Sequence, residues 1–282
     1  MNELVTCKNC GQVFAGKYCN NCGEKVLHAH DKSIGHFFED VVHFITHFDG
    51  KFFVTLKTMF RSPGKLSFDY VDGRRQPYFK PVSFFLLLVV LYLLFPFFQG
   101  LNMPLGGHLG QRTYRHYAQE KVNHYLQAHP GATMQQLSEK FAQKSEKTSK
   151  LLLFIIIPLT ALPLWLHTFR KRPYYYDHLV LATELNAVYI IITFFLLPLL
   201  LRLLNLVLTG MHQPNYQSAD GAAGIAMYLL FAVYCGIAIR RFYQLKWLQG
   251  FLILVILMAL HPYIVYVLYK FLLFVIAFAL VH

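Results

Sequence analysis

The sequence predicts an all-α integral membrane protein with about five transmembrane helices and a small N-terminal zinc ribbon. Three observations lead to this fold class. Hydrophobic residues make up 56% of the 282 residues and charged residues only 14%, which is too apolar for an ordinary soluble domain. The apolar residues gather in long runs with at most one charge each. Two Cys-x-x-Cys pairs lie within the first 22 residues.

This distribution divides the chain into three regions. Residues 1–27 form a cytosolic zinc ribbon, and residues 28–81 form interfacial amphipathic helices followed by a basic turn segment. Residues 82–282 form the transmembrane helical domain. No signal peptide opens the chain, so we expect the first apolar run to act as a signal-anchor.

The ribbon prediction rests on Cys7, Cys10, Cys19 and Cys22, because each pair is followed directly by a glycine. Four thiolates at this spacing supply the tetrahedral ligands of a structural Zn²⁺ and leave no open position for a substrate. Two disulfides or a redox Cys-x-x-Cys are the alternatives. A reducing cytosol and the absence of a surrounding βαβ pattern favour zinc. We expect Phe14 and Tyr18 to form the small apolar centre of this ribbon.

Amphipathic helices are predicted between the ribbon and the membrane. Aromatic and aliphatic residues recur at three-to-four spacing from residue 33 to residue 48 and again from 52 to 60, which is typical of helices at the membrane interface. Glu39, His43 and His47 are each four residues apart and therefore share a face. They are a candidate second metal site, although a polar face with freely titrating histidines explains them as well.

The basic turn segment combines two turns with a group of basic and tyrosine side chains. Ser62-Pro63-Gly64 suits a type II turn, with positive φ at the glycine, and Asp72-Gly73 marks a second turn. The candidate residues for binding an anion or a lipid headgroup are Lys65, Arg74, Arg75, Tyr78 and Lys80. Simple anchoring to lipid phosphates is the alternative role for the same residues.

Five apolar runs match the thickness of the hydrocarbon core. They cover residues 82–98, 151–169, 179–201, 222–239 and 247–281, with an outer helical loop at 100–150. The last run is too long for one straight span, so we expect Pro262 to kink it or its end to lie on the surface. In the outer loop, Thr133 and Gln136 form a capping box for a helix that runs on toward the second span.

The basic residues of the short loops set the orientation. Clusters at 74–80, 170–172 and 240–246 fall on one side if the N-terminus is cytoplasmic, and with five spans the C-terminus is then periplasmic. The expected location is the inner membrane of a bacterium. The net charge of +12 is therefore a topology signal, and nucleic acid is not an expected partner.

The third predicted span carries a candidate intramembrane polar site. Glu184 is the only acidic residue within a predicted span, and Asp177, seven residues earlier, lies on the same helical face beside His178. An acid in a membrane is a candidate proton relay, ion site or salt-bridge partner. A paired packing residue is the alternative.

Three stretches carry a family resemblance: "CKNCGQVFAGKYCNNCGEK", "FFVTLKTMFRSPGKLSFDYVDGRRQPYFKPVSFFLLL" and "PLTALPLWLHTFRKRPYYYDHLVLATELNAVY". On these the chain resembles the uncharacterised bacterial proteins grouped as domain of unknown function 3667, over most of its length. The resemblance implies a zinc ribbon on a multi-span membrane core, and no activity. Family members often carry a further histidine near the positions of Glu184 and Asn186, so no metal role for the third span is implied.

These features together favour a docking or assembly protein without catalytic activity. The expected partners are the lipid bilayer and a protein docked on the zinc ribbon, and the sequence does not specify an oligomeric state. The alternative function is binding or transport of an anionic lipid or small solute through the basic turn and Glu184. An enzyme acting on a lipid headgroup comes third, because no nucleophile–base pair or phosphate-binding loop is recognisable by spacing.

Overall fold

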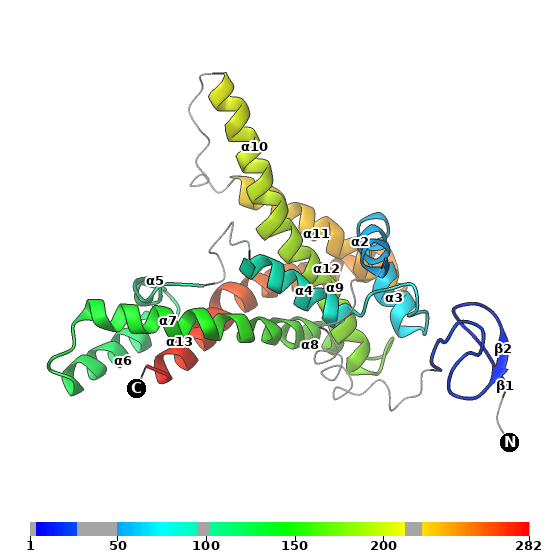
Figure 1. Ribbon diagram of the computed structural model, residues 1–282, viewed down its shortest axis with the longest axis horizontal. Coiled ribbons are helices and arrows are strands. Elements are labelled where there is room, and N and C mark those ends of the chain that lie inside the picture. The colour runs from blue at the N-terminus through cyan, green and yellow to red at the C-terminus, as the bar shows by residue number, and fades with distance from the viewer. Residues whose placement is uncertain (1–3, 27–49, 95–101, 212–221, 282) are drawn as a thin grey trace. The chain divides into compact units, whose positions relative to one another are not determined.

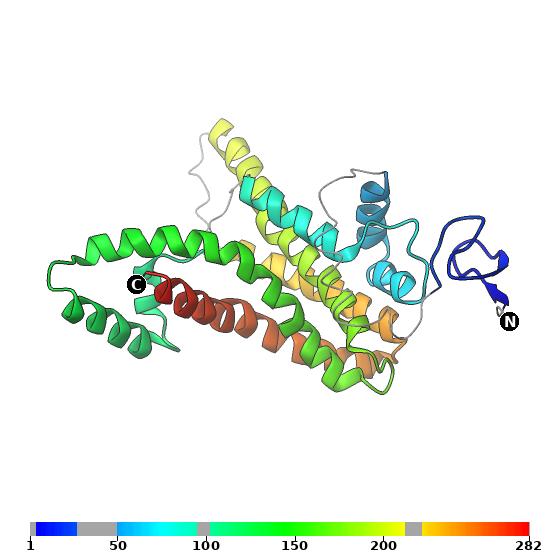
Figure 2. The same cartoon turned by 60° about the horizontal axis from the view of Figure 1, so that its bottom comes forward.

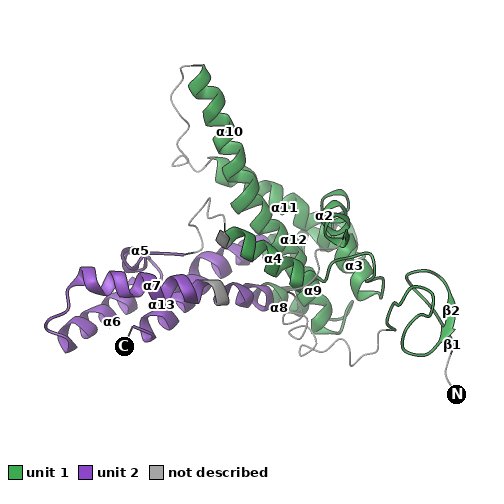
Figure 3. Cartoon of the chain, viewed as in Figure 1, with its two compact units in different colours: residues 1–97, 160–257 green, residues 98–159, 258–282 purple. Residues whose placement is uncertain are grey.

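The computed structural model describes residues 4–26, 50–94, 102–211 and 222–281. The chain divides into two compact units, which Figure 3 distinguishes by colour. Unit 1 comprises Met1–Phe97 and Thr160–Leu257, and unit 2 comprises Phe98–Leu159 and Met258–His282. The cysteine pairs and the basic turn segment both belong to unit 1.

Unit 1 begins with a two-stranded antiparallel sheet of β1 (Leu4–Thr6) and β2 (Val13–Ala15), drawn in blue in Figure 1. Phe14 is buried between Cys7 and Cys19, as predicted. The prediction that Tyr18 shares this centre is wrong, because its side chain is 61% exposed. Tyr18 lies beyond β2, where its backbone pairs with that of Lys25 and the ring faces outward. Val5 and Val26 pack against the centre instead.

The segment before the first apolar helix folds as two short helices. Helix α2 (Lys51–Arg61) buries Thr55 and Met59 and leaves Phe53 and Phe60 exposed, so part of its apolar surface is not covered by the described residues. Helix α3 (Lys65–Val71) follows the Pro-Gly turn. The interfacial helix expected at residues 33–48, and with it the candidate metal site of Glu39, His43 and His47, lies outside the described residues.

Helix α9 (Tyr175–Ile190) is the central helix of unit 1. Every residue from Tyr176 to Ile190 is buried, and the helix contacts α3, α11 (Ala222–Tyr243) and the apolar α4 (Pro81–Leu94). It continues through a π-helical stretch, η3 (Ile191–Leu196), into α10 (Leu197–Gly210). Pro198 explains the stretch, since proline lacks an N–H and crowds the carbonyl four residues earlier. Figures 1 and 2 show the end of α10 extending beyond the other helices of unit 1.

Three helices of the described residues are long and apolar enough to cross a membrane: Tyr175–Gly210, Ala223–Tyr243 and Trp247–Ala279. A fourth candidate is the bent pair Met134–Ser149 and Leu153–Thr168, if the pair forms one span. The structure therefore describes three or four candidate spans. The last of them is built from α12 (Trp247–Tyr263), the π-helical η5 (Ile264–Leu268) and α13 (Tyr269–Ala279).

In unit 2, aromatic residues form a core between α13 and the helices α5 (Leu105–Gly110), α6 (Arg115–Ala128) and α7 (Met134–Leu152). Helix α7 is followed in the chain by η2 (Leu153–Ile155) and α8 (Ile156–Thr168). The predicted capping box of α7 is confirmed. The backbone N–H of Thr133 donates to Gln136 Oε1 at 3.1 Å, and the N–H of Gln136 donates to Thr133 Oγ1 at 3.2 Å.

His108 is buried in unit 2. His108 Nδ1 lies 2.8 Å from the hydroxyl of Tyr114, and rings of Phe141 and Phe274 flank the imidazole. Its Nε2 is buried with no hydrogen-bond partner among the described residues. Burial, reinforced by the nearby charge of Lys270, lowers the pKa of His108 from 6.5 to about 4.

Acidification is therefore expected to destabilise unit 2. The unfolded chain binds a proton at His108 below pH 6.5, whereas the folded chain binds it only near pH 4. Stability should fall by about 3 kcal/mol as the pH drops through this window. Hydrogen exchange of residues 105–145 between pH 7 and pH 4 measures the effect. His108→Gln should remove this pH-dependent loss of stability. His116→Gln replaces an exposed histidine and should leave the loss unchanged. An unchanged pH profile in His108→Gln would show that another group is responsible.

Candidate functional site

The two cysteine pairs fold into two similar knuckles. Each pair is closed by a hydrogen bond from the following glycine back to the first cysteine: Gly11 N to Cys7 O at 2.9 Å and Gly23 N to Cys19 O at 2.8 Å. Both glycines have positive φ, 78° and 71°, which other residues adopt at a cost. The sequence therefore places the two turns where the cysteines can converge.

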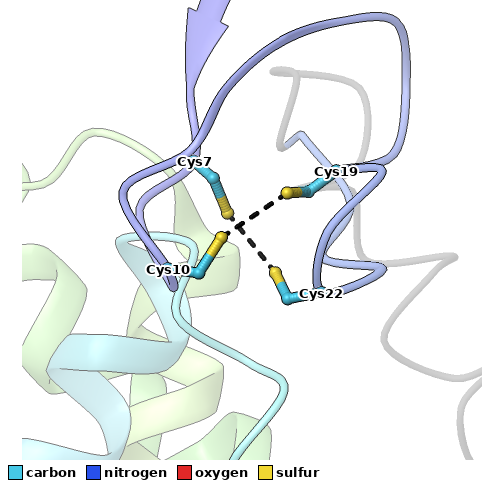
Figure 4. Close-up of side chains that lie close together, drawn as sticks. All are labelled: Cys7, Cys10, Cys19 and Cys22. Carbon is cyan, nitrogen blue, oxygen red and sulfur yellow. Dashed lines mark hydrogen bonds between the residues drawn. The ribbon is translucent and has the colours of Figure 1, made fainter.

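All four cysteine Sγ atoms lie within 4.8 Å of one another and can hold a metal ion. Figure 4 shows the side chains pointing toward a common centre, with 3.6 Å between the Sγ atoms of Cys7 and Cys22 and 3.6 Å between those of Cys10 and Cys19. Hydrogen bonding from the backbone N–H of Gln12 lowers the pKa of Cys10 to about 6, whereas burial raises that of Cys7 to about 11. A cation at this centre offsets the cost of ionising the buried thiol.

The ribbon is attached to the basic turn by a glutamate that sequence reasoning missed. Glu24 Oε2 accepts hydrogen bonds from the backbone N–H groups of Arg75 at 3.0 Å and Gln76 at 2.8 Å, and its residue is only 5% exposed. Glu24 directly follows the second knuckle, and its own carbonyl accepts the N–H of Cys19 at 2.8 Å. The cysteine cluster and the basic turn are thus linked through one residue.

The Pro-Gly turn is held by the central helix. Glu184 Oε1 accepts the backbone N–H of Gly64 at 2.9 Å and the hydroxyl of Tyr234 at 2.7 Å. Its Oε2 accepts the backbone N–H of Ser67 at 2.9 Å and also the Ser67 hydroxyl. The carboxyl group therefore binds the first, otherwise unsatisfied N–H groups of α3. A carboxyl group also suits the partial positive charge at that helix end.

Gly64 is required at this turn for two reasons. Its φ is 75°, as the type II turn predicts, and a β-carbon there would lie 2.5 Å from the carbonyl oxygen of Ala238 in α11. The neighbouring carbonyl of Pro63 accepts a hydrogen bond from Arg241 Nη1 at 2.7 Å. The turn is thus packed tightly between α9 and α11.

Most of the predicted anion-binding residues surround an internal carboxylate. Asp69 is 4% exposed and lies 2.7 Å from Lys65 Nζ, 2.7 Å from the hydroxyl of Tyr78 and 4.0 Å from Arg74 Nη1. Burial, together with the hydrogen bond to Asp69, raises the pKa of Tyr78 well above its usual range, so its hydroxyl stays a donor. The i,i+4 spacing of Lys65 and Asp69 is the signal that identifies this pair in the sequence.

The other two predicted anion-binding residues lie apart from Asp69. The guanidinium of Arg75 is 5.1 Å from the ring centroid of Tyr70, and its Nε donates to the Tyr70 carbonyl at 3.3 Å. Lys80 is exposed and precedes α4, where its carbonyl accepts the N–H of Phe84 at 2.8 Å.

Arg172 joins α3 to the end of the central helix. Its Nη1 lies 3.1 Å from Asp72 Oδ1 and 3.6 Å from Asp177 Oδ2. Its guanidinium carbon is 4.6 Å from the ring centroid of Phe242 and 5.3 Å from that of Phe68. Sequence reasoning did not predict the contacts of Arg172 with Asp72, Phe68 and Phe242, because these partners are remote in the chain.

The predicted polar site of the third span divides into two places. His178 Nε2 lies 2.9 Å from the carbonyl of Arg172, so this nitrogen carries the proton, and Nδ1 accepts from the hydroxyl of Tyr243 at 2.7 Å. Asp177 and His178 thus meet at Arg172. Glu184 instead binds the Pro-Gly turn, so the three residues do not share one ligand.

One family comparison matches part of the chain. Residues 49–93 match the family model described as "Protein of unknown function (DUF3667)". A search of curated proteins found no match, and neither did a search of solved structures. The matched segment contains the Pro-Gly turn and the basic turn, which Glu184 and Glu24 hold from either side.

Proposed function

We propose that this chain, whose DUF3667-matched segment connects a cysteine head to apolar helices, is a membrane-anchored docking protein that acts without catalysis. In this proposal the head recruits an acidic protein partner to the membrane. The observation that carries it is the free face of the ribbon sheet. The register pairs Leu4 with Ala15 and Thr6 with Val13, so these four side chains share the face opposite Phe14.

The free face is apolar and its surroundings are basic. Leu4 is 75% exposed and Val13 is 53% exposed. Lys8 and Lys17 are exposed in the same ribbon, whereas Glu24 is turned into the basic turn; within residues 4–26 no carboxylate is exposed. An exposed apolar patch with a charged rim is typical of a protein interaction site. Charge complementarity favours a partner with an apolar centre and an acidic rim.

The metal in this head is proposed to be zinc. A tetrahedral site with Zn–S bonds of about 2.3 Å separates the sulfurs by about 3.8 Å. The two Sγ–Sγ distances of 3.6 Å agree with this geometry. Four sulfur ligands fill the coordination sphere, so the metal serves the fold of the ribbon.

The proposed setting is a bacterial inner membrane with the N-terminus in the cytoplasm. Arg172 contacts Asp72, and Arg241 contacts Pro63, so basic clusters from three parts of the chain gather at one end of unit 1. Such a gathering supports the positive-inside orientation. The structure has three long candidate spans, or four with the bent pair. We propose that the shorter apolar helix α4 is a fifth span, which would make the C-terminus periplasmic.

Photo-crosslinking in the native cell tests the docking function. A diazirine amino acid at position 13 should yield an adduct with one defined protein. Lys8→Glu/Lys17→Glu should remove this adduct while the bound zinc is retained. The same amino acid at Lys57, an exposed position of α2, is the matched control. Adducts with lipid only, or a protein adduct that persists in the charge-reversed variant, would contradict the proposal.

A further inference from the structure

We infer that the turn at Arg74–Gln76 is an anion-binding site that the chain's own Glu24 occupies, and that a phosphate group takes this place when Glu24 leaves. Glu24 acts in this view as an internal ligand carried by the zinc ribbon. The inference goes beyond partner docking, and it concerns the part of the ribbon that contacts the basic turn through Glu24.

The turn has the donors of an anion site. Consecutive backbone N–H groups of Arg75 and Gln76 converge on one carboxylate oxygen, at 3.0 and 2.8 Å. Such converging amides form an anion-binding concavity. Arg75 adds an independent observation, because its Nη2 is buried and has no hydrogen-bond partner among the described residues. The guanidinium lies against Tyr70, and in this inference it turns toward the phosphate, which has more oxygens to contact than a carboxylate.

The charge around the turn favours phosphate once Glu24 is removed. Arg74 and Arg75 belong to the turn, and Lys51 Nζ lies 3.4 Å from the side-chain oxygen of Gln76. The nearby carboxylate of Asp69 is already matched by Lys65 at 2.7 Å. Departure of Glu24 therefore leaves an excess of positive charge beside two free amides. A phosphate carries more negative charge and more acceptor oxygens than a carboxylate does.

The contact between Glu24 and the turn borders a cavity. A cavity of about 220 Å³ lies between the ribbon and the end of α3, with Thr6, Lys25, Asp72 and Gly73 in its lining. The contact between the ribbon and the end of α3 is thus incompletely packed, unlike the turn at Gly64. Because the Glu24 carbonyl is bonded to the N–H of Cys19, the metal also positions the internal ligand. Loss of zinc and withdrawal of the ribbon should both expose the site.

Native mass spectrometry in a nonionic detergent tests this inference, with phosphatidic acid as the probe. Glu24→Ala should retain several-fold more phosphatidic acid than the wild type and still carry zinc. Glu24→Gln, which keeps the size of the side chain, should give a smaller increase. Arg75→Ala added to Glu24→Ala should remove the gain. Glu139→Ala deletes an exposed carboxylate elsewhere and controls for a general change in charge.

Inorganic phosphate distinguishes the sources of the ligand. If it displaces phosphatidic acid from Glu24→Ala, the site recognises free phosphate groups. If it does not, the site recognises the phosphate of a lipid headgroup. Equal retention by wild type, Glu24→Ala, Glu24→Gln and chelator-treated wild type would overturn the inference. That result would leave the docking proposal intact, because the crosslinking at position 13 does not involve the turn.

Discussion

Replacing Glu184 with alanine is expected to release the Pro-Gly turn and to lower the stability of unit 1 by about 3–9 kcal/mol. The carboxyl group serves the backbone N–H groups of Gly64 and Ser67 and the hydroxyl of Tyr234. Its removal leaves three donors in a buried place, and each unsatisfied buried donor costs roughly 1–3 kcal/mol. Unfolding in detergent and hydrogen exchange of residues 64–71 measure the loss.

Asn186→Ala is the matched control for this variant. Asn186 is also buried in α9, but its Nδ2 bonds only to the carbonyl of Ala182 in the same helix at 2.8 Å. Its loss should therefore cost far less. Glu184→Gln should also destabilise unit 1, because its amide nitrogen cannot accept from a donor. If Glu184 were solely a proton relay, Glu184→Gln would abolish function and keep the wild-type unfolding profile.

Removing the metal is expected to unfold residues 4–26 completely while the apolar helices persist. The apolar centre of the ribbon consists of Phe14 and two cysteines, with partly buried valines beside them. A core of this size cannot offset the entropy of ordering the chain. Structural zinc contributes about 10–16 kcal/mol of apparent binding energy in small finger peptides, which makes folding and binding one process. Hydrogen exchange before and after chelation measures this outcome.

Two cysteine variants sharpen the metal experiment. Cys19→Ser should lose zinc and the protection of residues 4–26 together. Cys235→Ser removes a cysteine that is buried in α11 and remote from the cluster, so zinc content should not change. Retention of zinc and of protection in Cys19→Ser would show that the four sulfurs do not form the site.

The local parts of the candidate site could be predicted from the sequence. Ligand spacing and the following glycines fix a cysteine knuckle within four residues, and Pro63-Gly64 fixes its turn in the same way. The burial of Phe14 follows from strand alternation. Tyr18 was misplaced because it lies beyond the strand, where alternation no longer determines the direction of a side chain.

The partners of these local features could not be predicted, because they are remote in the chain. Glu184 is 120 residues from Gly64, and Glu24 is 51 residues from Arg75. Helical periodicity places Glu184 on a face of α9 without indicating which amide group meets that face. For the same reason the sequence predicts an anion or a lipid headgroup, and not an internal carboxylate, as the ligand of the basic side chains at this turn. Asp69 lies among them, and only its spacing from Lys65 indicates the pairing.

The tightly packed Pro-Gly turn also imposes an order on biosynthesis. Glu184 is synthesised 120 residues after Gly64, and Arg241 is synthesised 178 residues after Pro63. At a translation rate of about 5–20 residues per second, the second interval lasts roughly 10–35 seconds. The nascent segment between the ribbon and α4 therefore stays incomplete until α9 and α11 have been made. A chain that ends after α9 would contain Glu184 but neither Tyr234 nor Arg241, so its turn would be only half assembled.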